Sequence, residues 1–161
     1  MRSNFDVFNI ADWFIANDSS MTPKKLQKMV YYAYAWTLTL MNDSVDNLKN
    51  KLFDAPIEAW VHGPVVKDLY QRYSNYGYNV IDSNDLSHQD SLDKIKQNPD
   101  IEDILQQVND VYGGYNANEL ESITHQQFPW QHAREGLSPL EATSNIITDE
   151  DMYRYYVSQE S

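Results

Sequence analysis

The 161-residue sequence contains no cysteine, which excludes disulfide bonds, thiolate catalysis and zinc sites built on thiolates. Five residues are glycine, and the one adjacent pair, Gly113-Gly114, lacks the following lysine of a phosphate-binding loop. The motifs His-Glu-x-x-His and Gly-x-Ser-x-Gly are missing as well. No apolar run is long enough for a signal peptide or a membrane span, so we expect a cytoplasmic protein.

Basic residues are scarce. Lysine and arginine together number 12 against 24 aspartate and glutamate residues, which gives a formal net charge of −12. Because phosphate backbones and anionic membranes are bound by clustered Lys and Arg, we expect neither nucleic acid nor a membrane as a partner. A basic protein would be attracted to this chain. Many cytoplasmic proteins are acidic without such a partner, so the charge alone leaves both interpretations open.

Helical periodicity covers most of the chain. Residues 22 to 41 are apolar nearly all round, with Thr22 as a cap and Pro23 in the first turn, which is typical of a central helix. We expect its core face to contain the following residues: Leu26, Val30, Ala33, Trp36 and Leu40. Amphipathic patterns predict further helices at residues 6–17, 101–112, 116–125 and after Thr148.

A short strand is predicted at residues 57–61, where apolar residues alternate with small or polar ones. We expect Gly63 to end it and Pro64 to begin a helix at once. Val80-Ile81 is the candidate second strand, in a polar stretch otherwise read as exposed loop. The predicted fold is therefore mainly α: a single compact helical domain over residues 1–161 with a minor strand element.

The histidines His62, His125 and His132 suggest a metal site or acid–base chemistry. No metal-ligand spacing relates them, and each is better explained as a turn cap or a partner of a buried carbonyl. We therefore expect no catalytic residue, no cofactor and no bound metal. The alternative is a small metal- or histidine-dependent hydrolase using His62, Glu58 and His125, in which the turn before a helix would hold an anion.

Tyrosine is abundant, with 12 residues, and exposed tyrosines are enriched at protein interfaces. Four lie on or beside apolar stripes and are expected in the core: Tyr31, Tyr34, Tyr70 and Tyr73. The candidates for exposed, partner-binding side chains are Tyr32, Tyr76 and Tyr78.

Three motifs carry a resemblance to a known family. They are Thr22-Pro-x-Lys-Leu-Gln-Lys-x-x-Tyr-Tyr-Ala, Leu52-Phe-x-x-Pro-Ile-Glu-Ala-Trp-x-x-Gly-Pro-Val, and Thr124-His125 with Pro129-Trp130. From about Phe5 to Val157 the chain resembles the Panacea antitoxin domain family, also known as SocA-like or phage-associated GepA-like proteins. The motif residues, interpreted as scaffold, are Trp60, His62, Gly63, Pro64, His125, Pro129 and Trp130.

The resemblance implies an antitoxin of a toxin–antitoxin system, encoded on a chromosome or a prophage, that neutralises its cognate toxin by direct protein–protein binding. It implies no enzymatic activity. Members of the family pair with unrelated toxins, many of them translation inhibitors acting on RNA, so the expected partner is a toxin with a basic surface. Some relatives carry an extra DNA-binding segment, and no basic or helix-turn-helix appendage is visible in this sequence. Whether the chain forms a homo-oligomer is left open.

Overall fold

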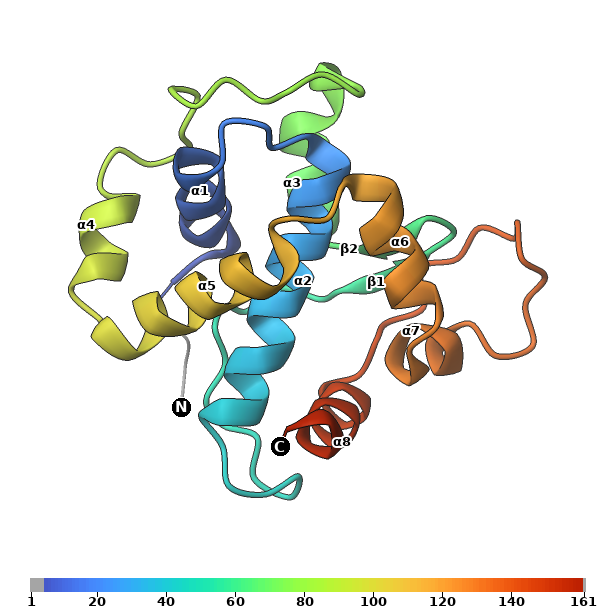
Figure 1. Ribbon diagram of the computed structural model, residues 1–161. Helices are drawn as coiled ribbons and strands as arrows, with labels where there is room; N and C mark the ends of the chain where they lie inside the picture. The colour runs from blue at the N-terminus through green and yellow to red at the C-terminus, as the bar shows by residue number, and fades with distance from the viewer. Residues whose placement is uncertain (1–4, 161) are drawn as a thin grey trace.

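Helices dominate the structure, a computed structural model that describes residues 5–160 (Figure 1). Its elements are α1 (Val7–Asn17), α2 (Pro23–Leu40), β1 (Glu58–Trp60), β2 (Gly63–Val65), α3 (Lys67–Tyr73), the 3-10 helix η1 (Ser74–Tyr76), α4 (Ser91–Lys96), α5 (Pro99–Tyr112), α6 (Ala117–His125), α7 (Phe128–Ala133) and α8 (Asp149–Gln159). The prediction of a mainly α fold with a minor strand element is confirmed. Within the described residues, no helix is both long enough and apolar enough to cross a membrane.

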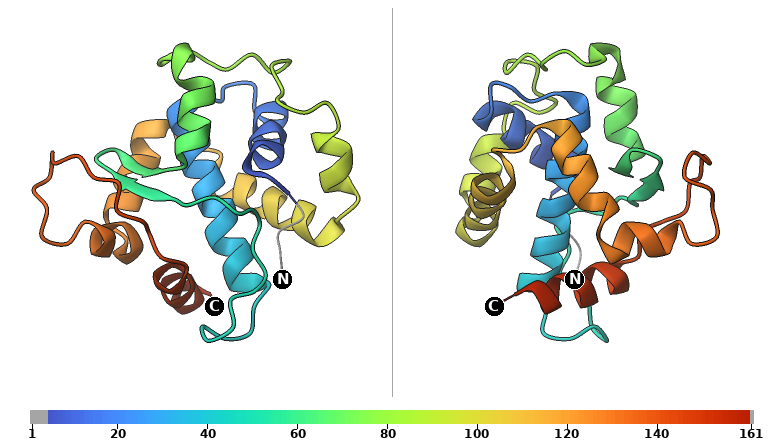
Figure 2. Two further views of the ribbon diagram at one scale, coloured as in Figure 1. Left: turned by 180° about the vertical axis from the view of Figure 1, so that it is seen from behind. Right: turned by 45° about the vertical axis from the view of Figure 1, so that its right-hand side comes forward.

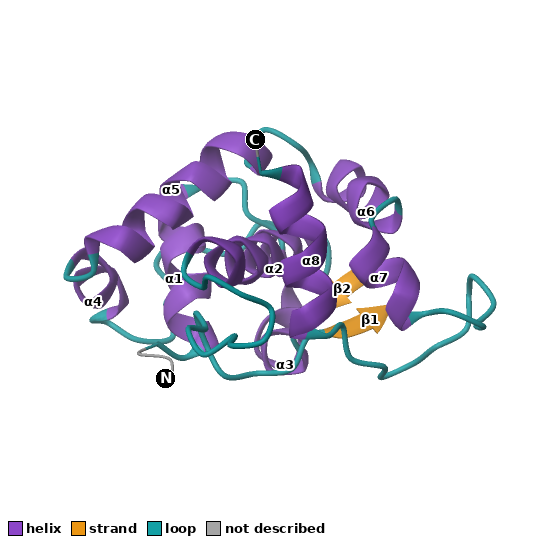
Figure 3. Cartoon of the chain, turned by 90° about the horizontal axis from the view of Figure 1, so that it is seen from below, coloured by secondary structure: helices purple, strands orange, loops and turns teal. Residues whose placement is uncertain are grey.

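The helix α2 runs through the middle of the molecule. Seen from below, α1, α5, α8 and the hairpin β1–β2 surround it (Figure 3). The Thr22 hydroxyl accepts a hydrogen bond from the Lys25 backbone N–H at 3.3 Å, and Pro23 lies in the first turn, as predicted. Every residue from Lys25 to Ala35 is buried, which confirms α2 as the central helix.

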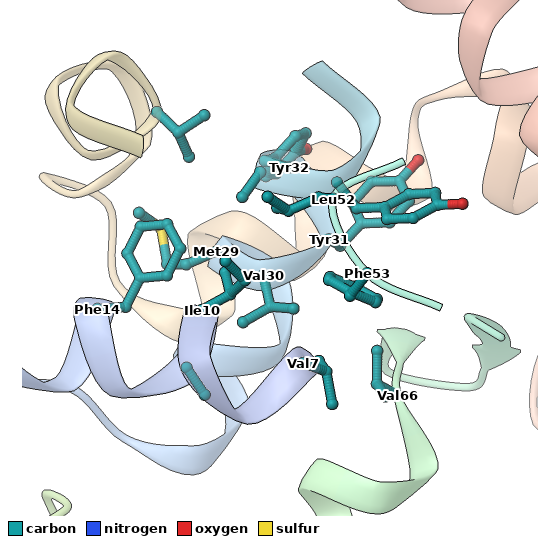
Figure 4. Packing of buried hydrophobic residues seen from close by; sticks show 14 of the residues in the cluster. Val7, Ile10, Phe14, Met29, Val30, Tyr31, Tyr32, Leu52, Phe53 and Val66 are labelled. Carbon is teal, nitrogen blue, oxygen red and sulfur yellow. The ribbon is translucent and has the colours of Figure 1, made fainter. Parts of the chain in front are cut away.

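The apolar core lies where α1 packs on the first half of α2. Figure 4 shows Ile10 and Phe14 of α1 facing Met29 and Val30 of α2, with Phe53 from the following connection closing the layer. These five side chains are fully buried. Since burying a large apolar side chain contributes roughly 1.5–3 kcal/mol, this layer is a main source of stability.

The last turns of α2 depart from the predicted core face. Leu40 is 42% exposed and Trp36 is only partly buried. The C-terminal end of α2 lies between α5 and the end of α8. A groove between these helices leaves Trp36 and Leu40 partly uncovered. The expectation that Leu40 is a core residue is therefore wrong, and Trp36 lies at the edge of the core.

Two tyrosine predictions are also wrong. Tyr32 is fully buried, because its ring stacks on Tyr112 of α5 at 3.8 Å and its hydroxyl donates to Gln127 Oε1 at 3.0 Å. Conversely, Tyr70 is 50% exposed, and its ring meets that of Trp60 in an edge-type contact at 5.0 Å between centroids. Three tyrosines are buried as predicted: Tyr31, Tyr34 and Tyr73. Of the two remaining candidates for exposure, Tyr76 is half-buried and Tyr78 is 95% exposed.

The predicted strand belongs to a hairpin. β1 pairs antiparallel with β2, with Ala59 opposite Pro64, so Pro64 lies in a strand and does not begin a helix. The next helix, α3, starts at Lys67. Gly63 has a φ of +114°, which turns the chain back on itself instead of leading it into a helix.

The other side of β1 is covered by a distant segment of the chain. The Ala59 N–H donates to the Asn145 carbonyl at 2.9 Å, and the Ile147 N–H donates to the Ile57 carbonyl at 2.8 Å. The expected pairing with Val80-Ile81 is wrong, because the Ile81 N–H donates to the Met21 carbonyl before α2.

Candidate functional site

The hairpin turn rests on a lysine of the central helix. A Cβ atom placed on Gly63 would lie 2.7 Å from Lys28 Cε and 3.1 Å from Lys28 Nζ. Glycine is therefore required at position 63 for two reasons: its φ is positive, and the end of the Lys28 side chain fills the space that a side chain would take.

Lys28 itself is unusual for a charged residue, since its side chain is 1% exposed. Burial lowers the pKa of Lys28 to about 7, because the ammonium group loses its hydration, and the positive charge of Lys24 lowers it further. The carboxylate of Glu121 partly opposes both effects. The amine under the hairpin therefore changes its charge near neutral pH.

Glu121 of α6 connects three charged or titratable side chains. Its Oε1 pairs with Lys24 Nζ, and its Oε2 lies 3.1 Å from His62 Nδ1 and 3.9 Å from His125 Nε2. Burial alone would raise the pKa of Glu121, but the hydrogen bonds from Lys24 and His62 outweigh this and keep its pKa below the ordinary value. Glu121 thus stays ionised and ties the hairpin turn to α2 and α6.

Trp130 of α7 closes the other side of the hairpin. Its indole N–H donates to the Trp60 carbonyl at 2.9 Å, and its ring stacks on His125 at 3.9 Å between centroids, with 11° between the planes. Burial lowers the pKa of His125, with partial compensation by Glu121, which favours the neutral imidazole in this stack. Pro129 is buried in the first turn of α7 and holds the backbone that presents Trp130.

Arg134 holds the hairpin through the backbone of β1. Its guanidinium is buried, donates to the Ala59 carbonyl at 2.8 Å and lies 5.4 Å from the centre of the Trp130 ring. The same group donates to the Ser138 and Glu141 carbonyls, at 3.2 and 2.6 Å. Arg134 therefore joins β1 to the connection between α7 and α8, which projects from the molecule as a long loop (Figure 2).

Gln27 fixes the exit from the hairpin. Its side-chain amide donates to the Val66 carbonyl at 3.1 Å, and its carbonyl oxygen accepts from the Val66 N–H at 2.8 Å. Val66 is the residue before α3, so this two-way contact takes the place of a side-chain cap, which α3 lacks.

The residues of the hydrolase alternative do not assemble. His62 and His125 both approach Glu121. Glu58 lines the same open hollow as His62, but its carboxylate accepts a hydrogen bond from Trp60 Nε1 at 2.9 Å and pairs with neither histidine. Across residues 5–160, no group of three or more His, Asp or Glu side chains is placed to hold a metal ion. His132 is elsewhere, where its Nδ1 lies 2.6 Å from Asp151 of α8.

The structure thus gathers most of the residues singled out in the sequence. Trp60, Gly63, His125 and Trp130 meet around the hairpin, and His62 reaches the same place through Glu121. Sequence reasoning missed the groups that connect them, namely Gln27, Lys28, Glu121 and Arg134. A signal was present for two of them: Gln27 and Lys28 are the Gln-Lys pair of the first family motif, Thr22-Pro-x-Lys-Leu-Gln-Lys.

A family model, described as antitoxin SocA-like, Panacea domain, matches residues 26–131. The chain belongs to this family. The matched range begins in α2 just before Gln27 and Lys28, includes the whole hairpin and α6, and ends one residue after Trp130. The Panacea match therefore contains the cluster around the hairpin except Lys24 and Arg134. Comparison with curated proteins gives no match, and comparison with solved structures gives none.

Proposed function

We propose that this chain is the antitoxin of a toxin–antitoxin pair and that it neutralises its cognate toxin by direct protein–protein binding. The observation that carries the proposal is its membership of the SocA-like Panacea antitoxin family. The binding is proposed to take place in the cytoplasm, with the toxin encoded next to this gene on a chromosome or a prophage. In this role the chain is not an enzyme, and the motif residues around Gly63 act as scaffold.

The charge of the chain supports a basic partner. A net charge of −12 accelerates encounter with a positively charged protein, and toxins that act on RNA need basic substrate grooves. The exposed tyrosine Tyr78 stays a candidate contact, and Tyr76 is weaker because its hydroxyl already bonds Asp85 at 2.6 Å. Tyr32 is no longer a candidate, since it is buried.

We also propose that the functional domain extends beyond the family match to the whole chain. Both α1 and α8 lie outside residues 26–131, yet both pack directly on α2. Tyr156 of α8 donates to Gln127 Oε1 at 2.8 Å, and the same oxygen accepts from Tyr32 of α2. A fragment limited to the matched range would therefore expose apolar surface on α2 and lose part of this buried network.

Growth on co-expression tests the proposal. The gene next to this one is induced alone, with this chain, and with a copy of this chain carrying an early stop codon. We expect growth arrest in the first and third strains and full growth in the second. Arrest in all three strains, with this protein present at normal level, would overturn the antitoxin role.

A further inference from the structure

An apolar groove opens on the face opposite the hairpin, between the last turns of α2, the second half of α5 and the end of α8. Its volume is about 330 Å³. The residues that line it are Trp36, Leu40, Ile104, Gln107, Val108, Val111, Tyr112, Gln159 and Glu160.

The groove has a buried apolar floor and exposed apolar edges. Ile104 and Val108 are buried in its floor, whereas Val111 is 61% exposed and Leu40 is 42% exposed on its edges. Trp36 donates to the Tyr112 hydroxyl at 2.9 Å, which holds both rings in place. A pre-formed apolar groove with exposed aliphatic edges is the usual receptor for the apolar face of an amphipathic helix.

The charged residues of α5 and the lining residue Glu160 are all acidic. The helix α5 carries four acidic residues and no lysine or arginine, and residues 29–40 of α2 carry no charge at all. The carboxylate of Asp103 accepts from Gln107 Nε2 at 2.8 Å, which places it at the rim, and Glu160 lines the opposite side. Asp110 follows Gln107 by three residues and so lies on the same side of α5.

We propose that this groove receives an amphipathic helix of the toxin, with an apolar stripe on one side and Lys or Arg residues flanking it. The inference rests on the proposed function and names the surface that performs it. A second copy of this chain is a poor occupant, because α5 of that copy would bring its own carboxylates against Asp103 and Glu160. The acidic rim selects a basic helix, and the apolar floor determines how long it stays bound.

Model peptides test the occupant on the full-length chain. The probe is a fluorescent 14-residue peptide of Leu and Lys with leucines at helical spacing. Its two controls are a Leu–Glu peptide of the same pattern and a Leu–Lys peptide with the stripe scrambled. We expect saturable binding of the first peptide and affinities at least about tenfold weaker for both controls. Equal binding of the scrambled peptide would overturn the proposal, because charge alone would then explain it.

A groove variant and a control variant test whether the peptide binds in the groove. The double variant Leu40→Ser/Val111→Ser removes two exposed apolar side chains without changing the charge. Substitutions at exposed positions change the stability of the fold little. The matched control is Leu92→Ser/Leu140→Ser, with side chains 37% and 84% exposed outside the groove. We expect about tenfold weaker peptide binding for the groove variant and less than about twofold change for the control. Equal effects of the two variants would contradict the groove as the site.

Toxin binding and growth rescue, measured with the product of the neighbouring gene, distinguish the groove proposal from the antitoxin proposal. If the groove variant loses both toxin binding and growth rescue while the control keeps both, the groove is the toxin site. If both variants rescue growth equally, the antitoxin role stands and the groove is not its surface. If sedimentation shows a dimer of the wild type that the groove variant dissociates, a second copy is the occupant and the proposal is wrong.

Discussion

Lys28 and Gly63 share one space. The end of the Lys28 side chain, on the central helix, lies where a side chain at position 63 would have to go, and the hairpin turn closes directly over it. Lys28 is 1% exposed, so a side chain at position 63 would have to displace the end of Lys28 from a buried place. The hairpin is thereby held to α2 at the point where His62, Glu121 and His125 also meet.

Replacing Gly63 by alanine tests this contact. We expect Gly63→Ala to lower the free energy of unfolding by about 2–4 kcal/mol, because it combines a positive φ with a close approach to Lys28. The matched control is Gly114→Ala, where an added Cβ meets nothing within 4 Å and the cost is expected to be close to zero. Urea denaturation of both variants gives the comparison. Equal losses of unfolding free energy would contradict the close approach of Lys28 to Gly63.

The buried amine of Lys28 predicts a dependence of stability on pH. Its pKa is about 7 in the folded protein and 10.5 as the ordinary value, so protonation favours the unfolded state. The destabilisation is complete below about pH 7 and is relieved as the pH rises toward about 10.5. Lys28→Met removes this group at similar size. We expect its stability relative to wild type to fall by about 2–3 kcal/mol between about pH 6 and pH 9. A constant difference across this range would show that Lys28 keeps an ordinary pKa.

His132 predicts a pH dependence of stability opposite to that of Lys28: its contribution is lost as the pH rises. The hydrogen bond and the charge of Asp151 raise the pKa of His132 above 6.5. The pair therefore contributes stability below about pH 6.5 that is lost as the pH rises through the higher folded pKa. We expect His132→Ala to lower the melting temperature more at about pH 5.5 than at about pH 9. In an Asp151→Asn background this difference should vanish, and its persistence there would assign it to another group.

Charge predicts the kinetics of toxin binding. Association of this chain with the neighbouring-gene product should slow as salt rises from about 0.05 to 0.5 M, where the Debye length falls below about 5 Å. Dissociation should change little, because desolvated apolar contacts determine it. Stopped-flow mixing measures both rates. An association rate independent of salt would show that the net charge of −12 has no part in recognition.

Helices could be predicted from sequence because each depends on local information. The central helix was identified within one residue from its apolar positions, Thr22 and Pro23. Asn116 and Glu119 form a capping box at the start of α6, and Asp6 caps α1 through Asn9. Periodicity and capping act within a few residues, so one sequence suffices to read them.

Features that depend on distant segments could not be predicted. Pro64 looked like a helix start, and only the contact of Gln27 with Val66 and the approach of Lys28 to Gly63 show why the chain forms a hairpin there. Tyr32 looked exposed because nothing local indicates that α5 and Gln127 cover it.

A buried carboxylate in α1 is a third feature that depends on a distant segment of the chain. Asp12 is 0% exposed and accepts hydrogen bonds from the Ser87 and His88 N–H groups and from the Ser91 hydroxyl. It thereby orders part of the polar stretch before α4, which sequence reasoning described as mostly exposed loop. No local pattern distinguishes this aspartate from a solvated one on the polar face of a helix.

The central claim, neutralisation by direct contact, is tested most directly by titrating the purified chain with the purified product of the neighbouring gene in a calorimeter. We predict a stoichiometric complex with a dissociation constant below about 1 μM, since an antitoxin must hold its toxin at cellular concentrations. Growth rescue on co-expression without any complex at micromolar concentrations would contradict direct binding, although the chain belongs to the Panacea family.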